Sequence, residues 1–405
     1  MIYQNFQTYS DFAGPLRAAA NVAAAALMHP PPGISRNAFV RAIAASCELI
    51  ARAGLSHHRP DFGIDSVTLG GRLAAIREVA IHRTPFCTLL RLEKDAEVVQ
   101  PRILLVAPMS GHFATLLRGT AETMLPDHDV YMTDWHNARD VALRHGRFDF
   151  DDFIEHLITF IEVLGPGTHV VGVCQPCVAV LAAVAIMAEA SHPAQPRSMT
   201  LMAGPIDARI NPTEVNRLAT SRSIGWFEQN LIGIVPLRYA GALRRVYPGF
   251  MQLAAFMSMN LDRHVKAQID LLYHLANGEK EKAAAISKFY DEYLAVMDLP
   301  AEFYLQTVRT VFQEHALPLC KFVWRGRRVD PRAIRHTALF TVEGERDDIC
   351  AVGQTLAAQD LCTGLRPYMK RHHVQTGVGH YGVFNGQRWK NSIYPILTNV
   401  IYAND

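Results

Sequence analysis

The chain has 405 residues, of which 49% are apolar and 19% are charged, and its formal net charge is +2. This length suits one large α/β domain with insertions or two domains, and the apolar content is sufficient for a sizeable core. The near-neutral charge gives no reason to expect nucleic-acid binding, and the 7 scattered cysteines suit a reducing compartment rather than a disulfide framework.

The first 60 residues are predicted to be helical and peripheral. Ala18–Met28 is apolar and alanine-rich, which predicts a helix that stops at the breaker His29–Gly33. An export signal is the alternative interpretation of this segment, although the N-terminus lacks the basic start of a signal peptide. Asn37–Ala53 has apolar residues spaced for a second helix. No stretch reaches the roughly 18 apolar residues that a membrane-spanning helix needs.

Alternating strands and helices follow. Val67–Glu93 is predicted to form antiparallel strands at one edge of a sheet, with the clearest strand at 85–92. A buried strand at Arg102–Ala107 is followed by a tight loop at 108–112 and a helix from about Thr115. A strand at Val130–Trp135 and a helix at Asp151–Leu164 come next. Another strand, Ser198–Met202, follows the segment described below. This alternation predicts a mostly parallel, doubly wound sheet.

A long insertion interrupts the alternation. Residues 206–335 have helical patterns, such as Glu279–Leu294, and many aromatic residues and methionines. We expect a helical lid inserted after the sixth strand, whose aromatic side chains either form its own core or line a groove. The strand pattern resumes at Ala338–Val342, with a helix near 352–360 and a strand at 373–376. The expected organisation is an N-terminal helical segment, 1–60, a core of 61–205 and 336–405, and a cap, 206–335.

The segment Thr168–Glu189 organises the rest of the chain. A β-branched strand ends at Val173, and a long uncharged helix begins directly after Cys174. A reactive side chain at such a turn projects from the end of a strand and lies at the positive end of a helix. The box Gly172–Pro176, GVCQP, corresponds to the nucleophile elbow G-x-S-x-G of α/β-hydrolases. Cysteine replaces serine, and Pro176 replaces the second glycine at a position that suits the first helical turn.

A cysteine nucleophile needs a base, and the base needs an orienting acid. In an α/β-hydrolase the acid follows a late strand and the histidine follows the last one. His380, which lies between glycines, has the position of the base. Asp347 is the preferred acid. Three other carboxylates in the same loop are the competitors: Asp348, Glu343 and Glu345.

The oxyanion hole is expected to use two backbone N–H groups. One belongs to Gln175, the residue after the nucleophile, and the other to Met109 or Ser110 in the loop after an earlier strand. His112 lies in the same loop, with a structural or a catalytic role.

The pair Cys174 and Cys177 admits other interpretations. C-x-x-C between a strand and a helix is typical of thioredoxin-like redox sites, but such domains are smaller and would leave Asp347 and His380 unexplained. Metal binding would require two further ligands, which no spacing provides, so we expect neither a metal nor a cofactor. A regulatory disulfide between the two cysteines is a further hypothesis, and a buried, inert Cys177 is its alternative.

The chain resembles the intracellular poly(3-hydroxybutyrate) (PHB) depolymerases. The similarity covers most of the chain from about residue 60 onward. It is carried by six blocks: Ala107–Thr120, Asp129–Val141, Val170–Pro176, Leu201–Thr213, Thr341–Ile349 and Thr376–Phe384.

The resemblance implies an α/β-hydrolase that cleaves the ester bonds of a stored polyester in the cytoplasm, with Cys174 as nucleophile, Asp347 as acid and His380 as base. Its partners would be the PHB granule surface and hydroxyalkanoate oligomers, and an oligomeric protein would be compatible with this role. The related polyester synthases use the same residue types with a G-x-C-x-G box, so a synthase-like acyltransferase is the alternative function. A redox or non-catalytic granule protein is the third hypothesis.

Overall fold

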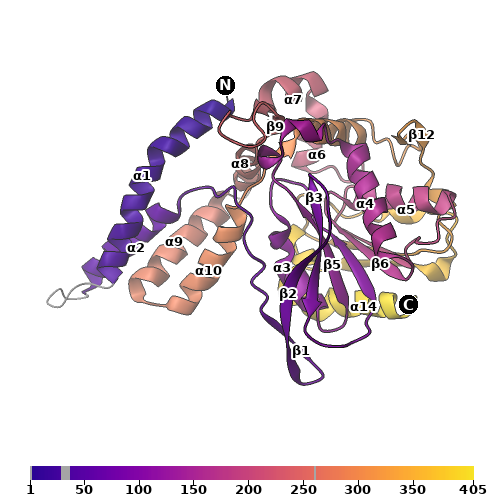
Figure 1. The fold of residues 1–405 in the computed structure, drawn as a ribbon, viewed down its shortest axis with the longest axis horizontal. Helices are drawn as coiled ribbons and strands as arrows, with labels where there is room; N and C mark the ends of the chain where they lie inside the picture. Colours follow the sequence, from indigo (N-terminus) through magenta and orange to yellow (C-terminus); the bar gives the residue numbers. More distant parts are fainter. Residues whose placement is uncertain (1, 29–36, 260) are drawn as a thin grey trace.

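The computed structural model describes residues 2–28, 37–259 and 261–405. Its central feature within these ranges is a nine-stranded sheet (Figure 1). In spatial order the strands are β1 (Ser66–Leu69), β2 (Arg72–Arg83), β3 (Cys87–Lys94), β5 (Asp129–Trp135), β4 (Arg102–Val106), β6 (Thr168–Val173), β7 (Ser198–Met202), β13 (Ala338–Gly344) and β14 (Lys370–Gln375).

The sheet is antiparallel at one edge and parallel elsewhere. β1, β2 and β3 pair antiparallel with their neighbours, and every pair from β5 to β14 is parallel. The inner parallel strands β4, β6 and β7 are mostly apolar and buried because helices cover both faces, whereas β14 at the edge is polar and partly exposed. β4 lies between β5 and β6, so the chain first winds in one direction and then in the other. This order is that of an α/β-hydrolase, and the predicted fold class is confirmed.

Helices lie on both faces of the sheet. They are α3 (Arg118–Met124), α4 (Phe150–Leu164), α5 (Cys177–Glu189), α12 (Ala357–Leu361), α13 (Gly386–Arg388) and α14 (Tyr394–Tyr402). α4 and α5 pack together on one face. α3 lies on the other face beside α14, as right-handed crossovers from β4 to β5 and from β5 to β6 require. A capping box of Asp149 and Asp152 starts α4, in accord with the predicted acidic first turn.

The insertion between β7 and β13 contains both helices and short strands. It follows the sixth strand if the short edge strand β1 is not counted. Its elements are α6 (Glu214–Ser221), α7 (Ile224–Leu231), β8 (Gly233–Ile234), β9 (Arg245–Tyr247), α8 (Gly249–Met259), α9 (Leu261–Asn277), α10 (Lys280–Tyr293), β10 (Leu299–Pro300), α11 (Ala301–Thr307), β11 (Val323–Trp324) and β12 (Arg327–Arg328). The expectation of a purely helical segment missed these strands, which are too short to show a periodicity of two.

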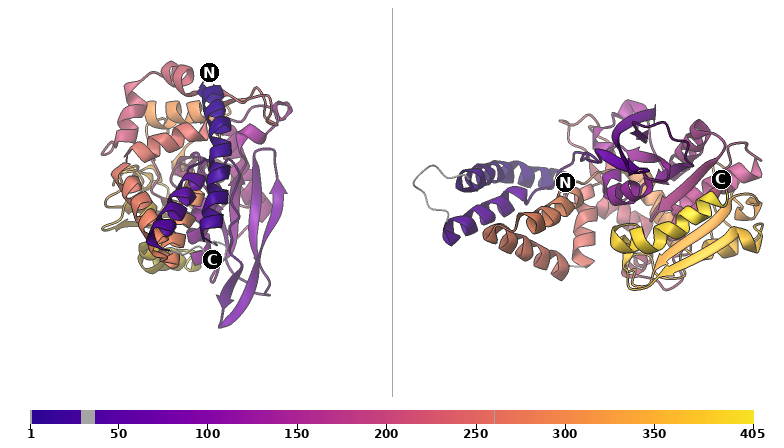
Figure 2. Two further views of the ribbon diagram at one scale, coloured as in Figure 1. Left: turned by 90° about the vertical axis from the view of Figure 1, so that its left-hand side faces the viewer. Right: turned by 90° about the horizontal axis from the view of Figure 1, so that it is seen from below.

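Four helices extend away from the sheet and form a helical arm (Figures 1 and 2). They are α1 (Ile2–Met28), α2 (Ala38–Arg52), α9 and α10, packed in the order α1, α2, α9, α10. α1 starts much earlier than predicted and includes Pro15. α2 has the predicted limits, with Asn37 as its N-cap. The predicted breaker at 29–33 lies outside the described residues.

None of the helices in the described ranges is both long enough and apolar enough to cross a membrane.

Candidate active site

Cys174 occupies a sharp turn between β6 and α5. Its φ angle is 65°, a left-handed conformation that residues other than glycine rarely adopt. Two backbone hydrogen bonds hold the turn: the Cys174 N–H donates to the carbonyl of Met202 at 2.7 Å, and its carbonyl accepts from the Cys177 N–H at 3.1 Å. The side chain remains partly exposed. This strained strand–turn–helix geometry is that of a nucleophile elbow.

Cys177 points into the core beneath this turn. A Cβ atom on Gly204 would lie 2.1 Å from the Cβ of Cys177, so only glycine permits this close packing. The buried thiol donates a hydrogen bond to the carbonyl of Gly172 at 3.2 Å, and burial raises its pKa well above the ordinary value. Cys177 is therefore a packing residue, as the alternative to the disulfide hypothesis proposed. The large sheet also excludes a thioredoxin-like domain.

Asp347 and His380 meet at the carboxyl ends of β13 and β14. Nδ1 of His380 donates to a carboxylate oxygen of Asp347 at 2.8 Å. The other oxygen accepts the N–H groups of Ile349 at 2.9 Å and Cys350 at 2.8 Å. Both side chains are buried. The carboxylate is thus fixed by the backbone of its own loop and can fix the imidazole in turn.

The His380 ring also contacts the thiol of Cys174. Burial opposes protonation of the ring, but the negative charge of Asp347 and hydrogen bonds to Asp347 and Cys174 raise the pKa of His380 well above its ordinary value. A cationic imidazole beside a sulfur is the arrangement that activates cysteine nucleophiles. The structure therefore brings together Cys174, His380 and Asp347, the three residues expected from the sequence.

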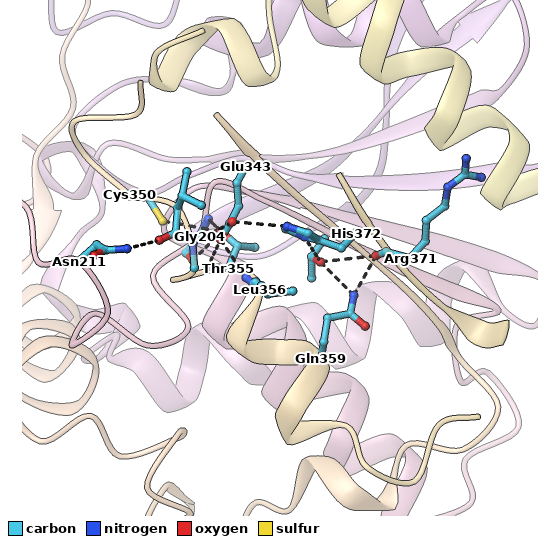
Figure 3. Close-up of polar contacts among 12 residues, drawn as sticks. Gly204, Asn211, Glu343, Cys350, Thr355, Leu356, Gln359, Arg371 and His372 are labelled. Atoms are coloured by element: carbon cyan, nitrogen blue, oxygen red, sulfur yellow. Dashed lines mark hydrogen bonds and ion pairs between the residues drawn. The ribbon is translucent and has the colours of Figure 1, made fainter. Parts of the chain in front are cut away.

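Glu343, a competitor for the acid, has a different set of partners (Figure 3). Its fully buried carboxylate accepts the backbone N–H groups of Gly353 at 2.9 Å, Thr355 at 2.7 Å and Leu356 at 2.9 Å. The hydroxyl of Thr355 accepts the N–H of Gly204 at 2.9 Å and donates to the Gly204 carbonyl at 3.0 Å. Because Gly204 packs against Cys177 at the start of α5, Glu343 supports the turn at Cys174 through Thr355 and Gly204.

The remaining two acids face elsewhere. Glu345 is exposed and accepts the N–H of Gly377 at 2.7 Å, which holds the loop before the histidine. Asp348 is exposed, in contrast to the buried Asp347.

The expected oxyanion donors lie at the elbow and in the loop after β4. The N–H groups of Gln175 and Ser110 donate no hydrogen bond within the described part of the chain. The Met109 N–H is occupied, because it donates to Oε1 of the Gln175 side chain at 3.3 Å. The spacing of the residues in the sequence does not indicate this side-chain contact.

His112 has a structural role in this loop. The ring is stacked against Tyr293 at 5.2 Å and Phe256 at 5.9 Å, and Nε2 lies 3.1 Å from the Tyr293 carbonyl. Burial lowers the pKa of His112 to about 4, so the ring is neutral at pH 7. An antiparallel β-bridge between His112 and Val296 joins the loop after β4 to the segment that follows α10.

The described residues contain no group of three or more His, Cys, Asp or Glu side chains arranged to hold a metal ion.

Several solved structures resemble the chain at low identity. The Rhodococcus sp. strain RHA1 2-hydroxy-6-oxo-6-phenylhexa-2,4-dienoate hydrolase is 11% identical, with 81% of this chain and 99% of that one covered and a TM-score of 0.44. The monoacylglycerol lipase of Paleococcus ferrophilus is 12% identical, with 76% of this chain and 96% of that one covered and a TM-score of 0.41. The thioesterase domain of the curacin biosynthetic pathway is 12% identical, with 83% of this chain and 98% of that one covered and a TM-score of 0.41. The comparison with curated proteins gave no match.

One family profile matches the second half of the chain. Its description is "PHB de-polymerase C-terminus", and it covers residues 203–405. The matched region contains Asp347 and His380, whereas Cys174 precedes it. This match supports ester hydrolysis. The chain therefore belongs to the PHB depolymerase family.

Proposed function

We propose that the chain hydrolyses ester bonds of PHB through a triad of Cys174, His380 and Asp347. The observation that carries the proposal is the constellation itself: a partly exposed thiol on a strained turn contacts a buried imidazole, which is hydrogen-bonded to a buried carboxylate. Nucleophile, base and orienting acid are the three roles that covalent ester hydrolysis needs.

In the proposed reaction the sulfur of Cys174 attacks the ester carbonyl carbon, and the carbonyl π electrons move to the oxygen. When the tetrahedral intermediate collapses, the C–O bond of the leaving group breaks and His380 protonates the departing alkoxide. His380 then removes a proton from water, whose oxygen attacks the thioester carbon. The C–S bond breaks, the thiolate of Cys174 is restored, and a hydroxy acid or oligomer is released. Asp347 holds the ring throughout and stabilises its cationic form. The N–H groups of Gln175 and Ser110 are free to stabilise the oxyanion.

The insertion, residues 206–335, is proposed as a cap over the carboxyl edge of the sheet, and its helices α9 and α10 continue into the helical arm. The loop that carries the oxyanion donors is joined to the insertion at two points: a Cβ on Gly111 would lie 2.8 Å from Cγ of Gln252, and the Met297 N–H donates to the Gly111 carbonyl at 2.9 Å. Tyr381, next to the proposed base, packs into the cluster of the insertion that contains Tyr293. We propose that this cap holds the neutral polyester at the surface of cytoplasmic granules through apolar contacts.

The test compares wild type with Cys174→Ala and Cys177→Ala on amorphous PHB. Release of 3-hydroxybutyrate should disappear in Cys174→Ala and persist in Cys177→Ala, because only the first thiol reaches the imidazole. Full turnover by Cys174→Ala would contradict the proposed nucleophile. A parallel assay with 3-hydroxybutyryl-coenzyme A distinguishes the synthase-like alternative, since polymer growth without soluble product would contradict hydrolysis.

A further inference from the structure

A cavity lies between the helices of the helical arm and α8. Its volume is about 430 Å³, within the range of about 300–1,000 Å³ that is typical of small-molecule pockets. Its walls come from α1, α2, α8, α9 and α10 and from the loop after α2 (Figure 1). The triad residues Cys174, His380 and Asp347 are not among the residues that line it. The space between packed helices is a common place for a ligand site.

The walls of this arm cavity are mainly apolar. Tyr9 is 67% exposed and Ile50 is 46% exposed, so the side of the cavity that they form opens to solvent. Apolar surface that water can reach favours an occupant that buries it. The apolar wall residues include Phe6, Leu49, Ile50, Leu55, Met257 and Leu271.

The charged groups at the arm cavity balance one another. Three charged residues line it: Arg17, Arg52 and Asp291. Arg52 pairs with Asp291 at 2.8 Å and with Glu48 at 3.2 Å. With Glu48 included, two positive charges lie beside two negative ones. This balance suits a neutral occupant better than a carboxylate or an ammonium ion.

Two of the polar side chains have donors to spare. The hydroxyl of Ser287 lines the cavity and forms no hydrogen bond within the described part of the chain. Arg17 donates to two backbone carbonyls, each at 3.3 Å, which leaves other N–H groups of its guanidinium unused. An aliphatic ester offers oxygen acceptors and apolar carbon, and it has neither a donor nor a charge. Its chemistry therefore matches both the walls and the free donors.

The packing around the arm cavity continues to the catalytic loop. Tyr290 and Leu294 line the cavity and pack in the same apolar cluster as Tyr381. Tyr381 directly follows His380, and its ring lies edge-on to the imidazole, with the ring centroids 6.0 Å apart. This cluster links the cavity to the loop that carries the proposed base.

We propose that the arm cavity is a second, non-catalytic binding site for a neutral segment of an aliphatic polyester. The apolar walls bury the methyl groups and chain carbons, and Ser287 and Arg17 donate to ester carbonyl oxygens. Such a site holds the polymer on the arm while another ester bond is cleaved at Cys174. This inference rests on the proposed ester hydrolysis, which supplies the substrate class.

The experiment is photoaffinity labelling of the full chain carrying Cys174→Ala, so that the probe is not consumed. The probe is the methyl ester of a 3-hydroxybutyrate trimer that bears a diazirine, and mass spectrometry locates the adducts. We expect adducts in the peptides of α1, α2 and α10 that line the cavity. Excess trimer methyl ester without the diazirine should abolish them, whereas octanoate, an apolar chain with a charged end, should not. Labelling confined to the surroundings of residue 174, or equally strong competition by octanoate, would overturn the proposal.

Ile50→Trp and Ile43→Trp, each in the same background, form a matched pair. Both positions are partly exposed on α2, at 46% and 38%, but only Ile50 lines the cavity. An indole at position 50 should fill the open side and remove the adducts, and an indole at position 43 should leave them unchanged. Ser287→Ala removes a donor without adding bulk and should also weaken labelling, which guards against a disturbance of the arm by the indole.

Unchanged labelling in both Ile50→Trp and Ser287→Ala would refute the site. Failure of the proposed function gives a different result, because wild type would then release no 3-hydroxybutyrate from amorphous PHB. Labelling of the arm cavity requires no turnover and is read independently.

Discussion

The carboxylate of Asp347 accepts a hydrogen bond from Nδ1 of His380 at 2.8 Å, and the backbone of the same loop holds its second oxygen. The imidazole is consequently fixed with Nδ1 toward Asp347, which leaves Nε2 for the thiol and the leaving group. This relationship distinguishes Asp347 from Glu343 and Glu345, whose carboxylates accept backbone N–H groups elsewhere. It also distinguishes Asp347 from Asp348, whose side chain is exposed.

Asp347→Asn should reduce kcat by about a thousandfold or more, because an amide can stabilise the wrong tautomer and cannot balance the imidazolium. Asp348→Asn is the matched control, since it makes the same chemical change one residue away on an exposed side chain. We expect it to retain nearly wild-type kcat. Steady-state hydrolysis of a 3-hydroxybutyrate trimer measures both, and equal losses would show that the wrong carboxylate has been assigned.

Glu343→Gln should affect stability more than chemistry. The Glu343 carboxylate accepts three backbone N–H groups, and an amide would present its own NH₂ to some of these donors. Leaving buried donors unsatisfied costs about 1–3 kcal/mol, which should appear as a lower free energy of unfolding in urea. Glu345→Gln, at an exposed position with one N–H partner, should change it by less than about 0.5 kcal/mol. Equal stability of the two variants would contradict the supporting role of Glu343.

Much of the fold followed from the sequence because its buried strands and capped helices carry strong local signals. The strand predicted at Arg102–Ala107 forms β4, and α4 begins at Phe150, one residue before the predicted Asp151. The strands of the insertion could not be predicted, since β8 and β10 have two residues each and are defined by partners distant in sequence. The early start of α1 was missed because Pro15 normally argues against a continuous helix.

For the site, chain order was enough to select Cys174 and His380, and the structure brings them together. The choice among the four acids at the end of β13 and in the loop after it depends on which side chain turns toward the ring, and sequence spacing alone can only rank them. The same limit applies to Gln175: its position predicts the role of its backbone N–H, but the contact of its side chain with Met109 depends on a loop 66 residues away. The catalytic roles of these residues stay predictions until the variants are measured.

Tyr3→Phe should loosen the helical arm. The Tyr3 hydroxyl donates to Asp298 at 2.5 Å, and the same carboxylate accepts the Gly249 N–H at 2.9 Å, so this buried contact fastens the start of α1 to the insertion. Loss of the hydroxyl leaves a fully buried carboxylate with one partner fewer, at a cost of about 1–3 kcal/mol in the free energy of unfolding. Tyr9→Phe on the same helix is the control, because Tyr9 is 67% exposed and should tolerate the change. Indistinguishable urea midpoints for the two variants would argue against the anchor.

Stability should fall as the pH decreases from about 6.5 to 4. Burial lowers the pKa of His57 to about 3 and those of His112 and His128 to about 4. In this pH range these three histidines are therefore protonated in the unfolded chain and mostly neutral in the folded chain, so acid favours unfolding. Asp298 acts in the opposite direction, because burial raises its pKa to about 6 and the folded chain takes up its proton first. These three histidines therefore favour unfolding in acid, and Asp298 opposes them.

His112→Gln tests this balance at a single group. Glutamine can keep a hydrogen bond to the Tyr293 carbonyl but does not titrate, so the dependence of the unfolding free energy on pH should become shallower by up to about 1.4 kcal/mol per pH unit, the value for one proton. Urea unfolding at several pH values between 4.5 and 7.5 measures the slope for both proteins. A wild-type stability that does not change over this range, or an identical slope in the variant, would show that His112 is not held neutral by burial.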